Sequence, residues 1–150
     1  MEIEIFAPFT GKVVPLEDVP DEAFAKKMLG DGVAILPSDG KFVAPIESRV
    51  FKIFETHHAY ILTNDKGIDI LIHIGIDTVE LKGEGFKNFV KISQKLNKGD
   101  LVSEIDINLI VQRGYNLHTP IIFTASEKFN SKFCYGDSIA GVTKIANFRT

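Results

Sequence analysis

The sequence has one cysteine, no tryptophan and two methionines among its 150 residues. A single cysteine, Cys134, excludes an internal disulfide framework and is compatible with a reducing compartment. No stretch approaches the roughly 20 apolar residues that cross a bilayer, and the first residues lack the basic head and apolar run of a secretion signal. We therefore predict a cytoplasmic protein that does not insert directly into a membrane.

A concentrated patch of positive charge is also absent. The formal net charge is -3, and no cluster of Lys and Arg interleaved with aromatic residues is present, which argues against a nucleic-acid partner. A basic protein partner is compatible with this charge. With 45% hydrophobic and 25% charged residues, the chain has the size and balance of one globular domain over residues 1–150.

Short apolar runs separated by turn residues predict an all-β fold. Runs rich in Val, Ile and Phe, such as Gly32–Leu36 and Ser48–Ile53, recur between Gly, Pro, Asp and Asn residues. This spacing is typical of a β-sandwich. Only Asp21–Leu29 and Phe86–Leu96 have helical character, so we predict one or two short helices at these positions.

The most informative segment is a predicted β-hairpin that runs from Thr56 to Gly75. Its second arm has isoleucine at positions 68, 70, 72 and 74, so these side chains should fill the core. The residues between them, among them Leu71 and His73, point the other way. His73 is therefore predicted on the accessible face of its strand.

The turn of this hairpin sets which residue faces His73. If the turn is centred between Asp65 and Lys66, as in a two- or four-residue loop, His58 pairs directly with His73, with Cβ atoms roughly 4.5 to 5.5 Å apart. In that register Ala59 and every second residue after it lie on the core side. A three- or five-residue loop shifts the pairing by one residue and puts the two histidines on opposite faces.

Two neighbouring imidazoles support three interpretations. The first is phosphoryl transfer, because a neutral imidazole is nucleophilic near pH 7 and a second imidazole can donate a hydrogen bond to phosphoryl oxygens. The second is a zinc site, in which Asp69 or Asp77 joins His58 and His73. The third is a pair of surface histidines without chemistry. The predicted exposure of Tyr60 beside the rings weakens this third interpretation, because an apolar rim favours a docking partner.

Two segments are long and specific enough to compare with known families. They are Ile53–Ala59 (IFETHHA) and Ile72–Phe86 (IHIGIDTVELKGEGF), and shorter segments such as Phe6–Pro8, Val43–Pro45 and Lys98–Asp100 extend the match over nearly the whole chain. The sequence resembles the glucose-class enzyme IIA family of the sugar phosphotransferase system. This resemblance implies an antiparallel β-sandwich with jelly-roll-like or Greek-key-like topology, and a phosphotransferase component that needs no cofactor.

The resemblance also implies a role for each site residue. His73 accepts a phosphoryl group from phospho-HPr and passes it to the cysteine of the enzyme IIB domain of a sugar permease, while His58 stabilises the phosphoryl group and Thr56 orients His58. The implied docking residues are the acidic Asp21 and Asp77, which suit an arginine of HPr, and an apolar ring of Phe24, Met28, Leu29, Phe54, Leu71 and Val79. In some relatives zinc is held by the two histidines at a regulatory interface, which makes His58 and His73 possible zinc ligands here.

Two other classes of protein share parts of this pattern. A zinc-dependent hydrolase on a related sandwich needs a third ligand in a His-x-His arrangement, which the sequence lacks. A non-catalytic binding module of the biotinyl or lipoyl kind needs a lysine at a hairpin tip, and Lys66 lacks the flanking residues of such a site. The chain also departs from the family at Leu71, where an aromatic residue is common, and at His57, where a smaller polar residue is common. Both departures affect the rim of the predicted site more than the transfer chemistry.

Overall fold

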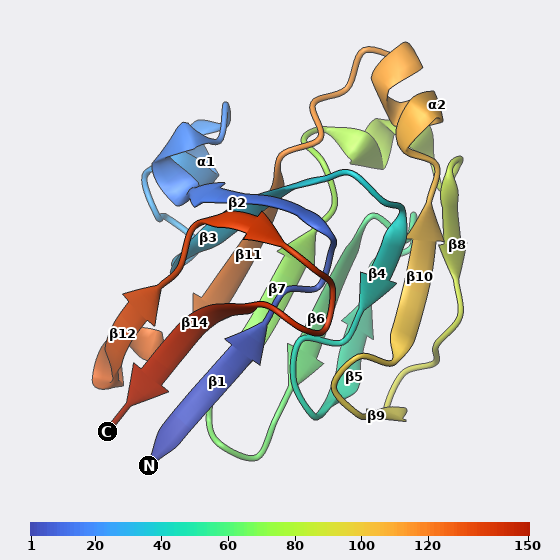
Figure 1. Cartoon of the computed structure of the whole chain (residues 1–150). Helices are drawn as coiled ribbons and strands as arrows, with labels where there is room; N and C mark the ends of the chain where they lie inside the picture. The colour runs from blue at the N-terminus through green and yellow to red at the C-terminus, as the bar shows by residue number, and fades with distance from the viewer.

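Antiparallel β-strands dominate the computed structural model, which describes residues 1–150 (Figure 1). The large sheet has the order β13 (Gly136–Ser138), β2 (Gly11–Pro15), β3 (Asp31–Pro37), β11 (Thr119–Thr124), β7 (Asp69–His73), β6 (Ala59–Thr63), β5 (Ser48–Ile53), β9 (Lys95–Leu96). Two three-stranded sheets complete the fold: β1 (Glu2–Phe6), β14 (Lys144–Arg149) and β12 (Asn130–Phe133), and β4 (Lys41–Val43), β10 (Leu101–Ile105) and β8 (Phe86–Asn88). The predicted antiparallel sandwich is confirmed.

The large sheet joins strands that are far apart in the sequence. β11 lies between β3 and β7, so long crossovers connect neighbours in the sheet, as in jelly-roll folds. The side chains between the sheets form one cluster of 30 buried residues. A second cluster of seven buried residues, which includes Leu16, Phe24 and Ile122, lies on the other face of the large sheet, and Leu71 packs against it.

Helical structure is confined to short segments. α1 (Glu22–Ala25) and α2 (Ile107–Gln112) are α-helices, and η1 (Leu16–Asp18), η2 (Thr78–Leu81) and η3 (Ser126–Lys128) are single 3₁₀ turns. The helix predicted over Asp21–Leu29 is therefore shortened to α1, because Lys27 adopts a left-handed backbone (φ 59°) that no helix continues through. Asp21 caps α1, and its carboxylate accepts hydrogen bonds from the amides of Ala23 and Phe24.

The helix predicted over Phe86–Leu96 is wrong. Phe86–Asn88 forms β8 and pairs with β10, and Lys95–Leu96 forms β9 and pairs with β5. These partner strands supply backbone hydrogen bonds that the local sequence pattern cannot reveal. The second helix of the structure is instead α2, which begins after Asp106, whose side chain accepts a hydrogen bond from the amide of Leu109.

The pairing of β6 with β7 differs from the predicted register by one residue. Ala59, not His58, lies opposite His73, and Tyr60 and Leu62 lie opposite Ile72 and Ile70. The loop between the strands has five residues, 64–68, so the shift that a five-residue loop produces has occurred. Tyr60 consequently points into the core and is fully buried, which corrects its predicted place on an exposed rim.

Candidate histidine site

His73 is the last residue of β7, at the end of the molecule where α1 and α2 lie (Figure 1). The isoleucines at positions 68, 70, 72 and 74 are all fully buried, whereas His73 is half-buried. The alternation of a strand therefore places the imidazole of His73 on the face opposite the main core, as the isoleucine period predicts.

Four aromatic rings form a continuous row at this face. The ring centroids of His58 and His73 lie 5.0 Å apart with their planes at 82°. The ring of Phe24, from α1, lies 5.1 Å from His73, and the ring of Phe54 lies 5.6 Å from His58. The two histidines are thus adjacent, with one phenylalanine packed against each.

His58 reaches this position from a loop, not from a strand. The loop after β5 contains His57, whose backbone is left-handed (φ 56°) and whose amide donates to the carbonyl of Phe54 (2.7 Å). The carbonyl of His58 then accepts a hydrogen bond from the amide of Ile74 (2.7 Å), which joins the loop to the residue after His73. The side chain of His58 is therefore free of the strict alternation of β6, and the two rings meet despite the shifted register.

Hydrogen bonds orient both imidazoles. Nδ1 of His73 lies 2.7 Å from the carbonyl oxygen of Gly75, an acceptor, so Nδ1 carries the proton and the lone pair of the neutral ring is on Nε2. Nδ1 of His58 is hydrogen-bonded to Oγ1 of Thr56. When the hydroxyl of Thr56 donates this bond, the neutral ring of His58 carries its proton on Nε2 and can donate to a bound group.

Burial keeps both rings neutral near pH 7. Burial, together with the smaller effect of the neighbouring His73, lowers the pKa of His58 to about 4. Burial also lowers the pKa of His73, against the opposing effects of the Gly75 carbonyl and of the carboxylates of Asp21 and Asp77. A neutral, oriented imidazole is a nucleophile, so the site suits covalent transfer of an electrophilic group.

The two predicted acidic docking residues flank His73 from different elements. Asp21 is half-buried at the start of α1, and Asp77 is exposed at the start of η2 with a left-handed backbone (φ 61°). Both carboxylates lie close enough to raise the pKa of His73. The structure therefore brings these two residues together around the histidine.

The predicted apolar ring is uneven in its exposure. Met28 is 70% exposed, Leu29 49% and Val79 48%, whereas Phe24 is only 6% exposed. Phe54 and Leu71 are half-buried. Met28 and Leu29 line a hollow shared with residues of η3 and the end of β11, whereas Phe24 packs against the imidazole of His73 itself.

Two contacts in the site are absent from the sequence prediction. The carbonyl of Gly75 is the partner of His73, and Gly75 itself has a positive φ of 76°. The side chain of Thr78 is fully buried and donates to the carbonyl of Ile74 (2.5 Å). A glycine two residues after the histidine is a turn signal, but the acceptor role of a backbone carbonyl leaves no trace in residue type.

The structure contains no group of three or more His, Cys, Asp or Glu side chains placed to hold a metal ion. His58 and His73 supply two imidazoles, whereas a protein zinc site usually has three or four protein ligands. The predicted participation of Asp69 or Asp77 as a third ligand is therefore not supported.

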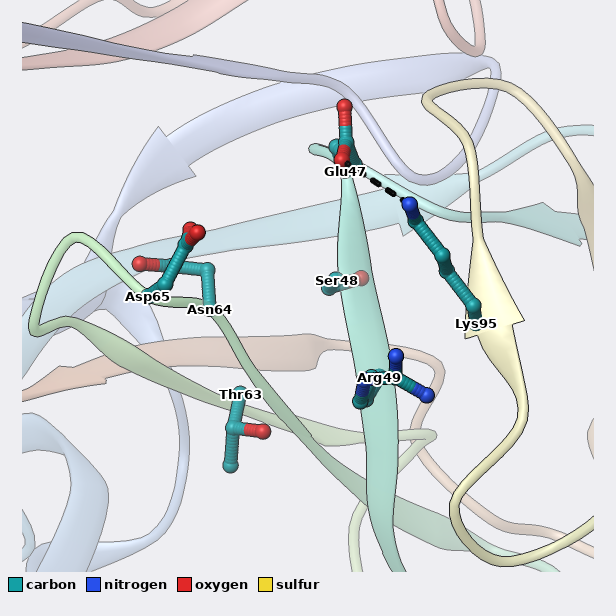
Figure 2. Close-up of a pocket in the computed structure, with 7 residues that line it drawn as sticks. All are labelled: Glu47, Ser48, Arg49, Thr63, Asn64, Asp65 and Lys95. Atoms are coloured by element: carbon teal, nitrogen blue, oxygen red, sulfur yellow. Dashed lines mark ion pairs between the residues drawn. The ribbon is translucent and has the colours of Figure 1, made fainter.

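A separate polar cleft of about 350 Å³ lies beside Thr63, the last residue of β6, whereas His58 precedes the first residue of that strand. Figure 2 shows the residues that line the cleft. It is lined by Glu47, Ser48, Arg49, Thr63, Asn64, Asp65 and Lys95. Lys95 lies 3.7 Å from Glu47, and Arg49 donates to the carbonyl of Ser93 (3.2 Å). Its cationic groups already have partners, and none of its lining residues is a histidine.

Comparison with known proteins identifies the family of the chain. Residues 3–129 match the family described as phosphoenolpyruvate-dependent sugar phosphotransferase system, EIIA 1. The chain belongs to this family. As a family member it is a phosphotransferase component and a phosphocarrier of the sugar phosphotransferase system, which receives a phosphoryl group from HPr and passes it to enzyme IIB.

Individual relatives are similar over most of the chain. This chain is 43% identical over 143 residues to the PTS system glucose-specific EIIA component of Buchnera aphidicola (95% of this chain, 89% of that protein). It is 42% identical over 130 residues to the protein of the same description from Haemophilus influenzae (87% and 78%). The glucose permease IIA from Mycoplasma capricolum has the same fold, with a TM-score of 0.91, 33% identity and coverage of 98% and 96%.

One similar protein of this enzyme IIA family is much longer. The chain is 48% identical over 126 residues, 84% of its length, to the PTS system glucose-specific EIICBA component of Staphylococcus saprophyticus, but spans only 19% of that protein. Neither helix of the present structure has the length and apolar character that a membrane-spanning segment requires.

Proposed function

We propose that Nε2 of His73 is the atom that accepts the phosphoryl group from phospho-HPr. The observation that carries this assignment is the hydrogen bond from Nδ1 to the carbonyl of Gly75, which leaves the lone pair on Nε2. The N–P bond of phospho-HPr breaks as the N–P bond to His73 forms. In the second step this bond breaks and a P–S bond forms on the cysteine of enzyme IIB. Positioning and electrostatic stabilisation dominate such transfers.

In the same proposal His58 is the residue that stabilises the phosphoryl oxygens. Its ring lies 5.0 Å from that of His73, and a donor on Nε2 can reach oxygens carried by the neighbouring ring. Thr56 holds His58 in this orientation through Nδ1. No cofactor takes part in the transfer, and any zinc held by His58 and His73 at a regulatory interface needs further ligands from a partner protein.

The proposed docking surface surrounds the two histidines. Asp21 and Asp77 pair with basic groups of HPr, and the apolar contacts come from the ring of Phe24, Met28, Leu29, Phe54, Leu71 and Val79. The exposure of Val79 and Met28 supports this role, because exposed apolar side chains beside a reactive group favour a protein partner. HPr and enzyme IIB meet the same surface in turn, since both must reach His73.

The descriptions of the similar proteins suggest which class of permease this chain serves. Because the curated relatives are described as glucose-specific, we propose that this chain serves a glucose-class permease. Residues 1–150 act as one enzyme IIA domain, and the transfer takes place in the cytoplasm.

Phosphorylation in a reconstituted system tests the assignment of His73. The protein is incubated with labelled phosphoenolpyruvate, enzyme I and HPr, and the bound phosphate is tested for acid lability and base stability. We expect one equivalent on the wild-type protein, none on His73→Gln, and a full equivalent on the control His118→Gln, which changes a histidine outside the aromatic row. Equal labelling of wild type and His73→Gln overturns the assignment.

A further inference from the structure

The loop between β7 and β8 presents two of the proposed docking residues, Asp77 and Val79. Its backbone is unusual, since Asp77 (φ 61°) and Lys82 (φ 54°) both adopt the left-handed conformation at the two ends of η2. This conformation is unfavourable for residues other than glycine and persists only where surrounding contacts hold it. The contacts that hold η2 therefore determine where Asp77 and Val79 lie.

Contacts from the interior hold the start of the loop. The buried hydroxyl of Thr78 donates to the carbonyl of Ile74, and the amide of Ile76 donates to the carbonyl of Asn116 (2.9 Å). The first bond holds η2 to the residue that directly follows β7, and the second joins the loop to the segment that follows α2. Neither bond involves the outer side of η2 or the residues after it.

Two side chains from the end of α2 hold that outer side. The guanidinium of Arg113 donates two hydrogen bonds to the carboxylate of Glu84, at 3.1 Å and 2.7 Å. The hydroxyl of Tyr115 donates to the carboxylate of Glu80, in η2, at 3.3 Å. In Figure 1, α2 (orange) lies beside the light-green segment that follows β7. The two contacts thus connect the residues that directly follow α2 to η2, through Glu80, and to the segment after η2, through Glu84.

These contacts add little to global stability. The side chains of Arg113 and Glu84 are 50% and 53% exposed, and exposed ion pairs contribute little to the free energy of unfolding. Two parallel hydrogen bonds between a guanidinium and a carboxylate, however, fix direction as well as distance. Their effect is therefore expected on the geometry of the loop.

We infer that Arg113 and Tyr115 are positioning residues that hold η2 so that Asp77 and Val79 meet the partner protein. This inference rests on the proposed function, because it concerns docking before phosphoryl transfer to His73. Neither residue touches the reacting atoms. We call the contacts of Arg113 with Glu84 and of Tyr115 with Glu80 the clamp. Loss of the clamp should therefore weaken the productive complex with phospho-HPr and leave the transfer step within the complex unchanged.

Steady-state phosphorylation by phospho-HPr tests the clamp. For Arg113→Gln and Tyr115→Phe we expect KM for phospho-HPr to rise roughly fivefold, with kcat and the melting temperature close to wild type. The exchanged pair Arg113→Glu with Glu84→Arg should restore KM to within about twofold. Arg149→Gln, which breaks the exposed contact between Arg149 and Glu2 on the β1–β14 sheet, is the matched control.

The outcomes separate the clamp from the function on which it rests. An unchanged KM in both single variants, or a raised KM that the exchanged pair does not restore, overturns the clamp while wild-type labelling of His73 stands. A fall in kcat without a change in KM also overturns it. Absence of label on the wild-type protein overturns the proposed function itself.

Discussion

The imidazole rings of His58 and His73 lie nearly perpendicular, with centroids 5.0 Å apart. Nδ1 of each ring is engaged in a hydrogen bond, to Thr56 in one case and to the carbonyl of Gly75 in the other. Both Nε2 atoms are therefore available, one as a nucleophile and the other as a donor. This division of roles, set by the hydrogen bonds of the opposite nitrogens, underlies the predictions that follow.

Removal of the His58 ring should slow transfer without removing the acceptor. In His58→Ala, His73 keeps its bond to Gly75, so labelling by phospho-HPr should still reach completion. Its rate should fall roughly 100-fold, because one donor to the charged phosphoryl oxygens is lost. His58→Gln, which retains a donor, should be intermediate. Rapid-quench labelling measures both rates, and equal rates for His58→Ala and wild type would contradict the proposed role.

The hydroxyl of Thr56 should matter through the orientation of His58. Thr56→Val keeps the shape of the side chain but removes the bond to Nδ1, so we expect transfer to enzyme IIB to slow about tenfold. Thr56→Ser retains the hydroxyl and should stay close to wild type. Single-turnover transfer from the phosphorylated protein to IIB is the measurement. A serine variant as slow as the valine variant would show that the hydrogen bond is not the cause.

Stability should depend on pH through His58. Burial and the neighbouring ring lower its pKa to about 4 from the ordinary value of 6.5, so the unfolded chain binds this proton at higher pH than the folded protein. The free energy of unfolding should then decrease as pH falls from 6.5 to about 4, and this contribution should be constant above 6.5.

Urea unfolding between pH 4 and 8 measures this dependence, and NMR titration of the imidazole gives the pKa of His58 directly. His58→Gln should have a flatter profile below pH 6.5, since its side chain does not titrate. A profile of equal slope in wild type and His58→Gln would assign the effect to other groups.

Asp21 has two functions that different substitutions can separate. Its carboxylate caps α1 by accepting from the amides of Ala23 (3.0 Å) and Phe24 (3.4 Å), and it also lies near His73. Asp21→Asn keeps a capping oxygen but removes the charge, so it should raise KM for phospho-HPr with little loss of stability.

Asp21→Ala removes the cap as well, and should lower the free energy of unfolding by about 1 kcal/mol. It should also disturb Phe24, whose ring packs against His73. Thermal unfolding and steady-state kinetics, compared between the two variants, distinguish charge from capping. Equal stability of the two variants would contradict the capping role.

Replacement of His57 by glycine should increase the free energy of unfolding. Its left-handed backbone (φ 56°) costs a non-glycine residue about 1 kcal/mol, and asparagine and glycine tolerate this conformation better. His57→Gly should be more stable than wild type by up to about 1 kcal/mol, whereas the β-branched His57→Val should be less stable by about the same amount. Labelling of His73 should reach one equivalent in both variants, and chemical unfolding gives the free energies.

The periodicity of the sequence correctly predicted side-chain direction where that direction depends only on neighbouring residues in the chain. The isoleucines of β7 alternate with polar and half-buried positions, and this pattern alone predicts which face His73 occupies. It failed for the register of β6 against β7, because register depends on the turn. Asn64 there donates to the carbonyl of Ile68 (2.6 Å) and accepts from the amide of Lys66 (2.8 Å), which forms the five-residue loop.

Pairing between distant segments explains the remaining errors. Phe86–Asn88 has a helical residue pattern but becomes a strand, because β10 offers it a ladder of backbone hydrogen bonds. Tyr60 is buried and not at the surface because the shifted register of β6 turns it into the core, where its hydroxyl bonds to Asn88 (3.0 Å). The strand partner of Phe86–Asn88 lies more than ten residues away in the chain, beyond the reach of a local pattern.

By itself, the sequence determined that the fold is a β-sandwich, that His73 lies on the accessible face of β7, and that two specific motifs surround the histidines. Only the tertiary structure decided how His58 meets His73. The left-handed backbone at His57 frees the ring of His58 from the alternation of β6, and Phe24 of α1 packs against the ring of His73. The physical reason is that side-chain direction along a strand follows a local period, whereas contact between two rings depends on loop geometry and packing that distant residues supply.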